Sequence, residues 1–170
     1  RSFFPWKLHF WEVFNDNWGF DIVIGNPPYN AELTELEKEY FKEKYPSVRT
    51  WRQDTAWIFC EFWNNILVNK WVLNYILPFR LISRKRNHWL FQEYLLTSIN
   101  VEKILYLWSN VWFTANDEFM ILQLINSFND DNNIKISLKP NFTNWLTFKI
   151  IKQKIFKDYW EFNLNFLKFD

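Results

Sequence analysis

One stretch of the chain, residues 20–30, most restricts the folds that this sequence can adopt. It is an apolar run that ends on a polar residue, two prolines and an aromatic residue. Residues 22–24 are all β-branched and continuous rather than alternating with polar residues, which is typical of a strand covered on both faces. Pro27 and Pro28 end that strand, because each fixes φ and lacks a backbone donor. The sequence therefore predicts an α/β fold in which a buried strand runs into a stiff loop.

The stiff loop offers free acceptors at a place where open α/β sheets bind ligands, the carboxyl end of a strand. Asn26 has a side-chain carbonyl, Pro27 has a main-chain carbonyl, and Tyr29 adds a flat ring. Two acceptors and a ring suit a planar amine. A rigid turn between a strand and a helix is the alternative, since Asn and Pro are also ordinary turn formers.

The motif Asn26-Pro27-Pro28-Tyr29, placed after this strand, resembles the catalytic motif of S-adenosylmethionine-dependent amino-methyltransferases. The likeness is greatest to DNA adenine-N6 methyltransferases of type II and type IIG restriction-modification systems, and it covers about residues 8–126. It implies that the Asn26 and Pro27 oxygens hold the N6 hydrogens of an adenine flipped out of double-stranded DNA. Tyr29 would stack on that base. In this interpretation all four residues of the motif are catalytic.

The resemblance also implies an architecture, the second half of a Rossmann-like methyltransferase sheet. That sheet would be mostly parallel, with a final antiparallel hairpin and helices on both faces. We expect an approach segment at 1–19, a catalytic methyltransferase subdomain at 20–127 and the start of a possible target-recognition region at 134–170. The hydrophobic patterns predict helices at 31–45, 54–69, 87–99 and 143–157, and further strands at 71–77, 101–107, 118–125 and 134–138. The strands at 101–107 and 118–125, joined without a helix, are expected to pair at the edge of the sheet.

Two further residues are candidates for substrate binding through the same resemblance. In similar methyltransferases an Asp or Asn followed by aromatic residues lines the active-site side of the sheet, which points to Asp54. The alternative for Asp54 is that it only caps the helix that follows. An aromatic residue before the last strand packs against the flipped base in similar enzymes, which points to Phe113, although core packing explains it as well.

Four basic residues follow the second expected strand and would lie on the same rim as Asn26. Arg80, Arg84, Lys85 and Arg86 can neutralise DNA phosphates, or they can simply form a solubilising loop. The net charge of the chain is only +1, so any contact with DNA must come from a local patch.

The chain has 12 Trp and 2 Gly, whereas average usage predicts about 12 glycines in this length. Trp18, Trp71 and Trp89 occupy positions at element boundaries where glycine is common. We hypothesise that many of these tryptophans correspond to UGA codons in a lineage that reads UGA as glycine. A genuinely tryptophan-rich core or stacking surface is the alternative.

The S-adenosylmethionine site is expected to lie mainly outside this chain. It needs a glycine-bearing turn after the first strand and an acidic residue after the second, and both would precede Arg1. We therefore expect a fragment of a larger enzyme, whose partner is the remainder of the same polypeptide or a specificity region.

The remaining features narrow the setting and leave other functions open. A single cysteine, the lack of a long apolar run and the lack of a metal-ligand cluster predict a cytoplasmic protein with no metal and no membrane partner. A protein glutamine-N5 methyltransferase or an RNA amino-methyltransferase would use the same motif. A non-catalytic remnant or DNA-binding fragment is the alternative outside enzymes.

Overall fold

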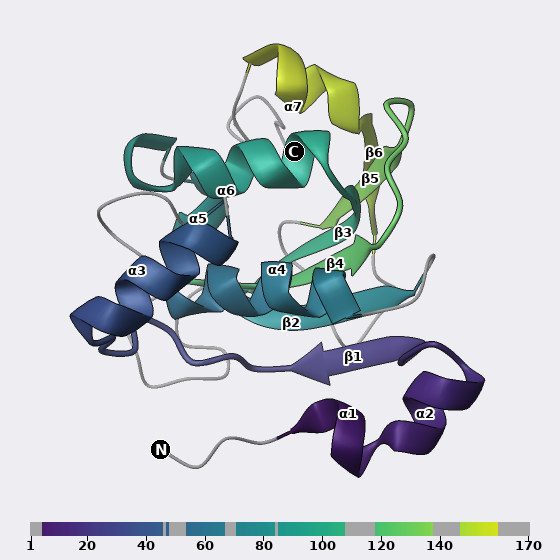
Figure 1. Cartoon of the computed structure of the whole chain (residues 1–170). Coiled ribbons are helices and arrows are strands. Elements are labelled where there is room, and N and C mark those ends of the chain that lie inside the picture. Colours follow the sequence, from purple (N-terminus) through teal and green to yellow (C-terminus); the bar gives the residue numbers. More distant parts are fainter. Residues whose placement is uncertain are drawn as a thin grey trace.

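A six-stranded sheet forms the centre of the computed structural model (Figure 1). The described residues are 5–45, 47, 54–66, 71–83, 85–107, 118–137 and 147–159, with the backbone alone at 6, 64–66, 85–87 and 159. The strands are β1 (Ile22–Gly25), β2 (Val72–Pro78), β3 (Asn100–Leu107), β4 (Phe119–Ile125), β5 (Asn133–Ser137) and β6 (Lys149–Lys152). Their order is β1-β2-β4-β3-β5-β6. Strands β1, β2, β3 and β5 run in one direction and β4 and β6 in the other, so the predicted mixed α/β architecture is confirmed.

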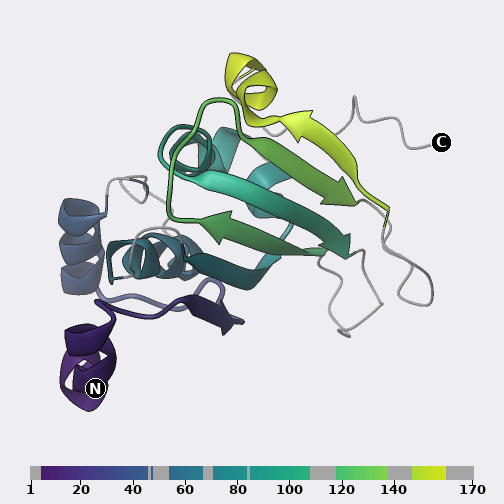
Figure 2. The same ribbon diagram turned by 90° about the vertical axis from the view of Figure 1, so that its right-hand side faces the viewer.

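Two of the helices, α4 and α6, pack as one layer against this sheet. The described helices are α1 (Trp6–His9), α2 (Trp11–Asp16), α3 (Glu35–Lys44), α4 (Thr55–Ile66), α5 (Arg80–Ser83), α6 (Lys85–Thr97) and α7 (Gln153–Tyr159). In Figure 2 the sheet faces the viewer, and α4 and α6 lie behind it. The second layer of helices that the resemblance implies is not among the described residues.

The two faces of the sheet differ in how deeply their side chains are buried. Leu73, Tyr75 and Leu77 of β2 are at most 3% exposed, and the register places them beside Leu124, Leu122 and Met120 of β4. The alternate residues are half-buried, and they are Val72, Asn74, Ile76, Ile121, Gln123 and Ile125. The Gln123 amide donates to Asn74 at 2.8 Å among them. The main core therefore lies between the sheet and the layer of α4 and α6.

The β3–β4 pair differs in position from the expectation. The two strands are antiparallel, as predicted. The edge position is wrong, because β4 lies between β2 and β3 and the strands β5 and β6 continue the sheet beyond β3. Strand β4 is paired along both of its edges, with β3 on one and with β2 over seven residues on the other. A local hydrophobic pattern carries no information about the distant partner β2.

The C-terminal part of the chain extends the same sheet. Strand β5 confirms the expected strand, but the helix expected at 143–157 is wrong in part, because residues 149–152 form β6 and the helix α7 begins only at Gln153. Strand β5 pairs with β3 in parallel and with β6 in antiparallel fashion. The target-recognition region at 134–170 stays a prediction, and its described strands β5 and β6 are hydrogen-bonded into the same sheet as β1–β4.

A buried glutamine ties α7 to the rest of the fold. Gln153 is 1% exposed. Its Oε1 accepts from the Val101 amide at 3.0 Å and from the Asn132 side chain at 2.8 Å. Its Nε2 donates to the carbonyls of Leu95 at 3.0 Å and Ile99 at 2.8 Å, at the end of α6. One side chain therefore links α7, β3 and the end of α6.

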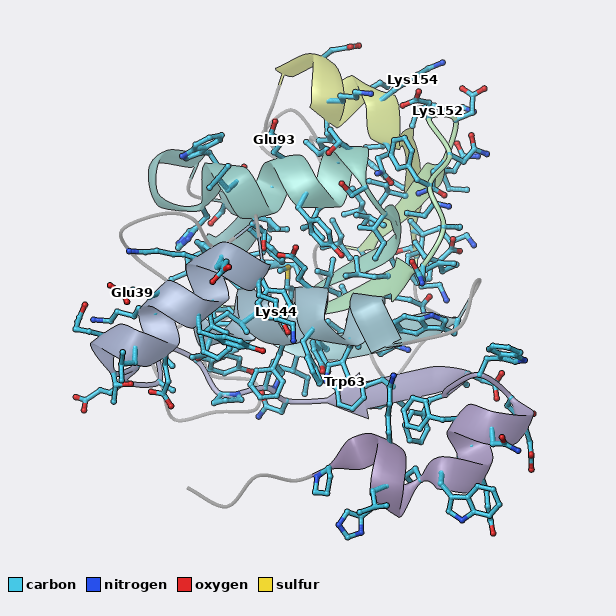
Figure 3. The ribbon with its side chains drawn as sticks, in the orientation of Figure 1. Glu39, Lys44, Trp63, Glu93, Lys152 and Lys154 are labelled. Atoms are coloured by element: carbon cyan, nitrogen blue, oxygen red, sulfur yellow. The ribbon has the colours of Figure 1, made fainter. Side chains whose placement is uncertain are left out.

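The segment before β1 forms the short helices α1 and α2, which pack around Phe20. The Phe20 ring makes edge contacts with Phe10 and Phe14, at centroid distances of 5.3 and 5.6 Å. Trp63 reaches from α4 toward β1 and meets Phe20 at 6.5 Å (Figure 3). These contacts fix the beginning of β1. In the described part of the chain, no helix has the length and apolarity that a membrane span requires.

Two of the tryptophans noted in the sequence lie in unusual surroundings. Trp18 has φ of 64° and is 81% exposed. This left-handed conformation is rare for a bulky residue and ordinary for glycine. Trp71 is 3% exposed, and its indole Nε1 has no hydrogen-bond partner among the described residues. A buried donor without a partner is costly, so neither position is one that favours tryptophan.

Candidate active site

The candidate site begins where β1 ends, beside the carboxyl half of β2. The two strands are parallel, and Gly25 lies opposite Tyr75. A Cβ atom at position 25 would come within 2.9 Å of the Tyr75 ring, closer than real Cβ atoms approach. Glycine at position 25 therefore lets β1 pass close to the Tyr75 ring just before the loop.

Tyr29 connects the loop to β2. Its hydroxyl donates to the Ile76 carbonyl at 2.7 Å and also contacts the Asn26 side-chain oxygen. A phenol has one proton, so it serves one of these two acceptors at a time. The Tyr29 ring lies 5.8 Å from the Phe119 ring, which is at the start of β4. Tyr29 thus sits at the junction of β1, β2 and β4.

The hydroxyl of Tyr29 stays protonated in this environment. Burial and the negative charge of Asp54 raise the pKa of Tyr29 to about 12, and the positive charge of Arg80 partly opposes that rise. Near neutral pH the side chain is therefore a neutral ring with one donor, which suits stacking and positioning rather than proton transfer.

The two oxygens that were predicted to hold a substrate amine lie at the start of the loop. Asn26 is exposed, so its amide is accessible from outside the fold. The Pro27 carbonyl accepts no hydrogen bond from the residues that the structure describes. Asn26 Oδ1 contacts the Tyr29 hydroxyl and keeps a second lone pair, whereas Pro27 is a buried residue. Of the two predicted acceptors, Asn26 is therefore the one that lies open at the carboxyl end of β1.

The second half of the loop is held by the first turn of α4. The Thr55 hydroxyl donates to the Pro28 carbonyl at 2.7 Å and accepts from the Ala31 amide at 3.2 Å. Asp54 Oδ1 accepts from the Asn30 amide at 3.4 Å. Asn30 has φ of 49°, a left-handed conformation that Asn tolerates better than most residues. The second half of the loop is thus fixed to α4, while the side chain of the exposed Asn26, in its first half, contacts the Tyr29 hydroxyl.

Asp54 is buried beneath the loop and has several roles at once. It is 2% exposed. Its Oδ1 accepts from the Ala56 amide at 3.0 Å, so the predicted helix cap is confirmed. Its Oδ2 lies 3.5 Å from Arg80 Nη2. With the Asn30 amide oxygen turned to Arg80, the side chain of Asn30 accepts from Arg80 at 2.8 Å and donates to Asp54 at 3.2 Å. A compact polar network therefore lies under residue 30.

The predicted substrate-binding residues are brought together only in part. Asp54 and Arg80 lie together next to the motif, and Arg80 reaches Asp54 from the first residue of α5. Arg84 and Phe113 lie outside the described residues, and of Lys85 and Arg86 only the backbone is described, in the first turn of α6. Where these four side chains act stays a prediction.

Thr55 is the residue of this site that the sequence did not indicate. Threonine in the first turn of a helix is common, and nothing nearby in the sequence marks its link to residues 28 and 31. The nearest signal is Asp54, whose capping role places position 55 at the helix start. No group of three or more His, Cys, Asp or Glu side chains among the described residues is placed to hold a metal ion.

The order and direction of the strands, with helices packed on the sheet, define a fold class, the Rossmann-like α/β fold. A type IIG restriction endonuclease, BpuSI, has a similar fold, with a TM-score of 0.63 and 14% identity over 82% of this chain and 20% of that one. The methyltransferase subunit of a type I restriction-modification system from Streptococcus thermophilus has a TM-score of 0.57 and 18% identity, over 89% of this chain and 32% of that one. At these identities the likeness shows the fold alone.

The sequence itself shows the family. The Eco57I restriction-modification methylase family matches residues 1–113, and the chain belongs to it. The chain is 32% identical over 137 residues to the type II restriction enzyme and methyltransferase RM.Eco57I of Escherichia coli, over 77% of this chain. It is also 33% identical over 104 residues, or 61% of the chain, to a putative enzyme of the same kind from Methanocaldococcus jannaschii. The chain spans 13% of the first relative and 8% of the second.

Proposed function

We propose that this chain carries the methyl-acceptor part of the catalytic site of a DNA adenine-N6 methyltransferase that uses S-adenosylmethionine. One observation carries the proposal: the exposed Asn26 directly follows β1 at its carboxyl end, next to the Pro27 carbonyl, while residues 28–31 are fixed to α4. Membership of a restriction-modification methylase family supports the reaction type. That the methyl group goes to the N6 atom of adenine is the part of the proposal that rests on the Asn26–Tyr29 motif.

The chemistry of an aromatic amine explains why two acceptors are needed. The lone pair of adenine N6 is delocalised into the ring, so the amine is a poor nucleophile. Asn26 Oδ1 and the Pro27 carbonyl would each accept one N6 hydrogen, which localises the lone pair and points it at the methyl donor. The N6–methyl bond would form as the bond between the methyl group and the donor sulfur breaks, and both oxygens would stabilise the positive charge that N6 gains. The extra N6 proton would be released to water afterwards. No general base is needed before the methyl group is transferred.

Tyr29 would provide the surface on which the flipped base lies. Stacking on an aromatic ring contributes about 1–3 kcal/mol per base. The hydrogen bond from the Tyr29 hydroxyl to Ile76 holds the ring in place, so this side chain loses little freedom when the base arrives. Phe119 supports the ring from β4.

The methyl donor would supply an electrophilic methyl group when it is bound. The two glycines of the chain do not fit a cofactor turn after a strand. Gly19 precedes β1, and Gly25 is the last residue of β1, where the close Tyr75 ring leaves no room for a Cβ atom. We therefore assign the main cofactor turn to polypeptide outside this chain. What these residues contribute is the acceptor side of the reaction.

The test uses the enzyme that contains this chain, with Asn26→Ala compared with the parent. We expect single-turnover methyl transfer to adenine in DNA to fall by about a hundredfold or more, while the dissociation constant for DNA changes by less than about twofold. Asn17→Ala is the matched control, because Asn17 is an exposed asparagine in the turn before β1.

Two results would contradict the proposal. Equal losses of transfer and DNA affinity would remove the assigned role of Asn26. A parent enzyme that methylates RNA or glutamine in a release-factor protein, and leaves adenine in DNA unmodified, would replace the substrate class. Product analysis for N6-methyladenine separates these cases.

A further inference from the structure

We infer that Thr55 is a positioning residue that holds the Asn26–Tyr29 loop in its reactive shape. The inference rests on the proposed function and extends it from the residues that touch the base to the one that fixes them. Thr55 is 5% exposed and is the first residue of α4. Its hydroxyl lies between the two ends of the chain segment that contains Tyr29 and Asn30.

The chemistry of this contact requires a hydroxyl group. A carbonyl on one side, at Pro28, needs a donor, and an N–H on the other, at Ala31, needs an acceptor. A threonine hydroxyl meets both needs with one atom. Its β-branched side chain also has few rotamers, so the oxygen stays between the two backbone groups.

The backbone conformation inside this segment explains why it must be held. Asn30 has a positive φ of 49°, and such strained residues persist only where the surrounding structure holds them. The contacts from Thr55 on both sides, and that of Asp54 to the Asn30 amide, provide this support. The Thr55 contacts flank Tyr29, whose hydroxyl contacts the Asn26 side chain. A shift of the Pro28 carbonyl would therefore reach both the stacking ring and the acceptor.

Thr55→Val keeps the shape of the side chain and removes only the hydroxyl chemistry, and Thr55→Ser keeps the hydroxyl. In the enzyme that contains this chain, we expect Thr55→Val to slow single-turnover methyl transfer about tenfold or more. The dissociation constant for DNA should change by less than about twofold. Thr55→Ser should stay within about threefold of the parent rate. Hydrogen exchange at the Ala31 amide should become faster in the Val variant and stay slow in the Ser variant.

The same assays distinguish failure of the proposed function from failure of the role of Thr55. A parent that transfers no methyl group to adenine overturns the proposed function and this inference with it. A parent that is active, with Asn26→Ala inactive and Thr55→Val equal to the parent, leaves the function intact and overturns the role of Thr55. Equal losses of rate and DNA affinity in Thr55→Val would also overturn it. If Thr55→Val does not fold, Thr55→Ala is compared with Thr55→Ser by the same measurements and criteria.

Discussion

Replacement of Gln153 by Met tests whether the C-terminal strands and α7 form one cooperative unit with the sheet that carries the loop. Met has a similar length and fills the same buried space without polar atoms. The change leaves the Val101 amide, in a residue that is 0% exposed, without its acceptor. It also removes the donor that serves the carbonyls of Leu95 and Ile99.

The size of the effect follows mainly from these three groups, because the Asn132 side chain, which also donates to Gln153, keeps its hydrogen bond to the Val101 carbonyl. An orphaned buried amide costs about 1–3 kcal/mol, and each lost hydrogen bond to a carbonyl costs about 0.5–1.5 kcal/mol. We expect the free energy of unfolding to fall by about 3 kcal/mol. For a domain of this size that corresponds to a decrease of about 6–12 °C in melting temperature.

The assay is urea unfolding, followed by circular dichroism, with Gln123→Met as the matched control. Gln123 makes one half-buried hydrogen bond, to Asn74, so its loss should cost less than about 1.5 kcal/mol. A single transition with an unchanged m-value is expected for both variants. Equal destabilisation by the two changes, or a separate early transition in the Gln153 variant, would falsify the reasoning.

Two further predictions concern backbone strain and pH. Trp18→Gly should raise the free energy of unfolding by about 1 kcal/mol, because glycine relieves the left-handed strain at this exposed site. The control Trp11→Gly, in the exposed helix α2, should lower the free energy of unfolding by a similar amount. Destabilisation by both changes would contradict the interpretation of position 18. Burial raises the pKa values of Tyr29 and Tyr106 to about 12 in the fold, above the value of about 10 in the unfolded chain. The stability that this shift contributes is therefore complete below pH 10 and is lost as the pH rises toward 12; a chemical denaturation midpoint that stays constant over that interval would contradict it.

The local patterns are sufficient to predict the strand, the loop and the three longest helices, α3, α4 and α6, but not the short helices α1, α2 and α5. A continuous β-branched run followed by two prolines defines β1 and its end from neighbouring residues alone. Asp54 was found as a cap because capping is also local. The position of β4 between β2 and β3, and the strand at 149–152, depend on partners far away in the sequence. Hydrophobic patterns cannot specify those partners.

The same distinction explains why the site was only partly predictable. Asn26 and Tyr29 lie in one short motif whose chemistry can be interpreted without a fold. Thr55 acquires its role only because the parallel pairing of β1 and β2 brings the start of α4 under residues 28–31. Polar residues that act through tertiary contacts, Gln153 among them, look like ordinary helix-start residues in the sequence.

Under the proposed function, the edge of β1 is where a cofactor-binding part of the enzyme would join the sheet. Among the described strands β1 pairs only with β2, and Ile22 and Ile24 are 60% and 79% exposed. An apolar, uncharged edge strand is a hazard that proteins normally cover. A further parallel strand paired with β1 would place its own carboxyl end, where open α/β sheets bind ligands, beside Asn26. Under the proposed function, the donor and the acceptor of the methyl group would then meet across β1, because Asn26 directly follows that strand.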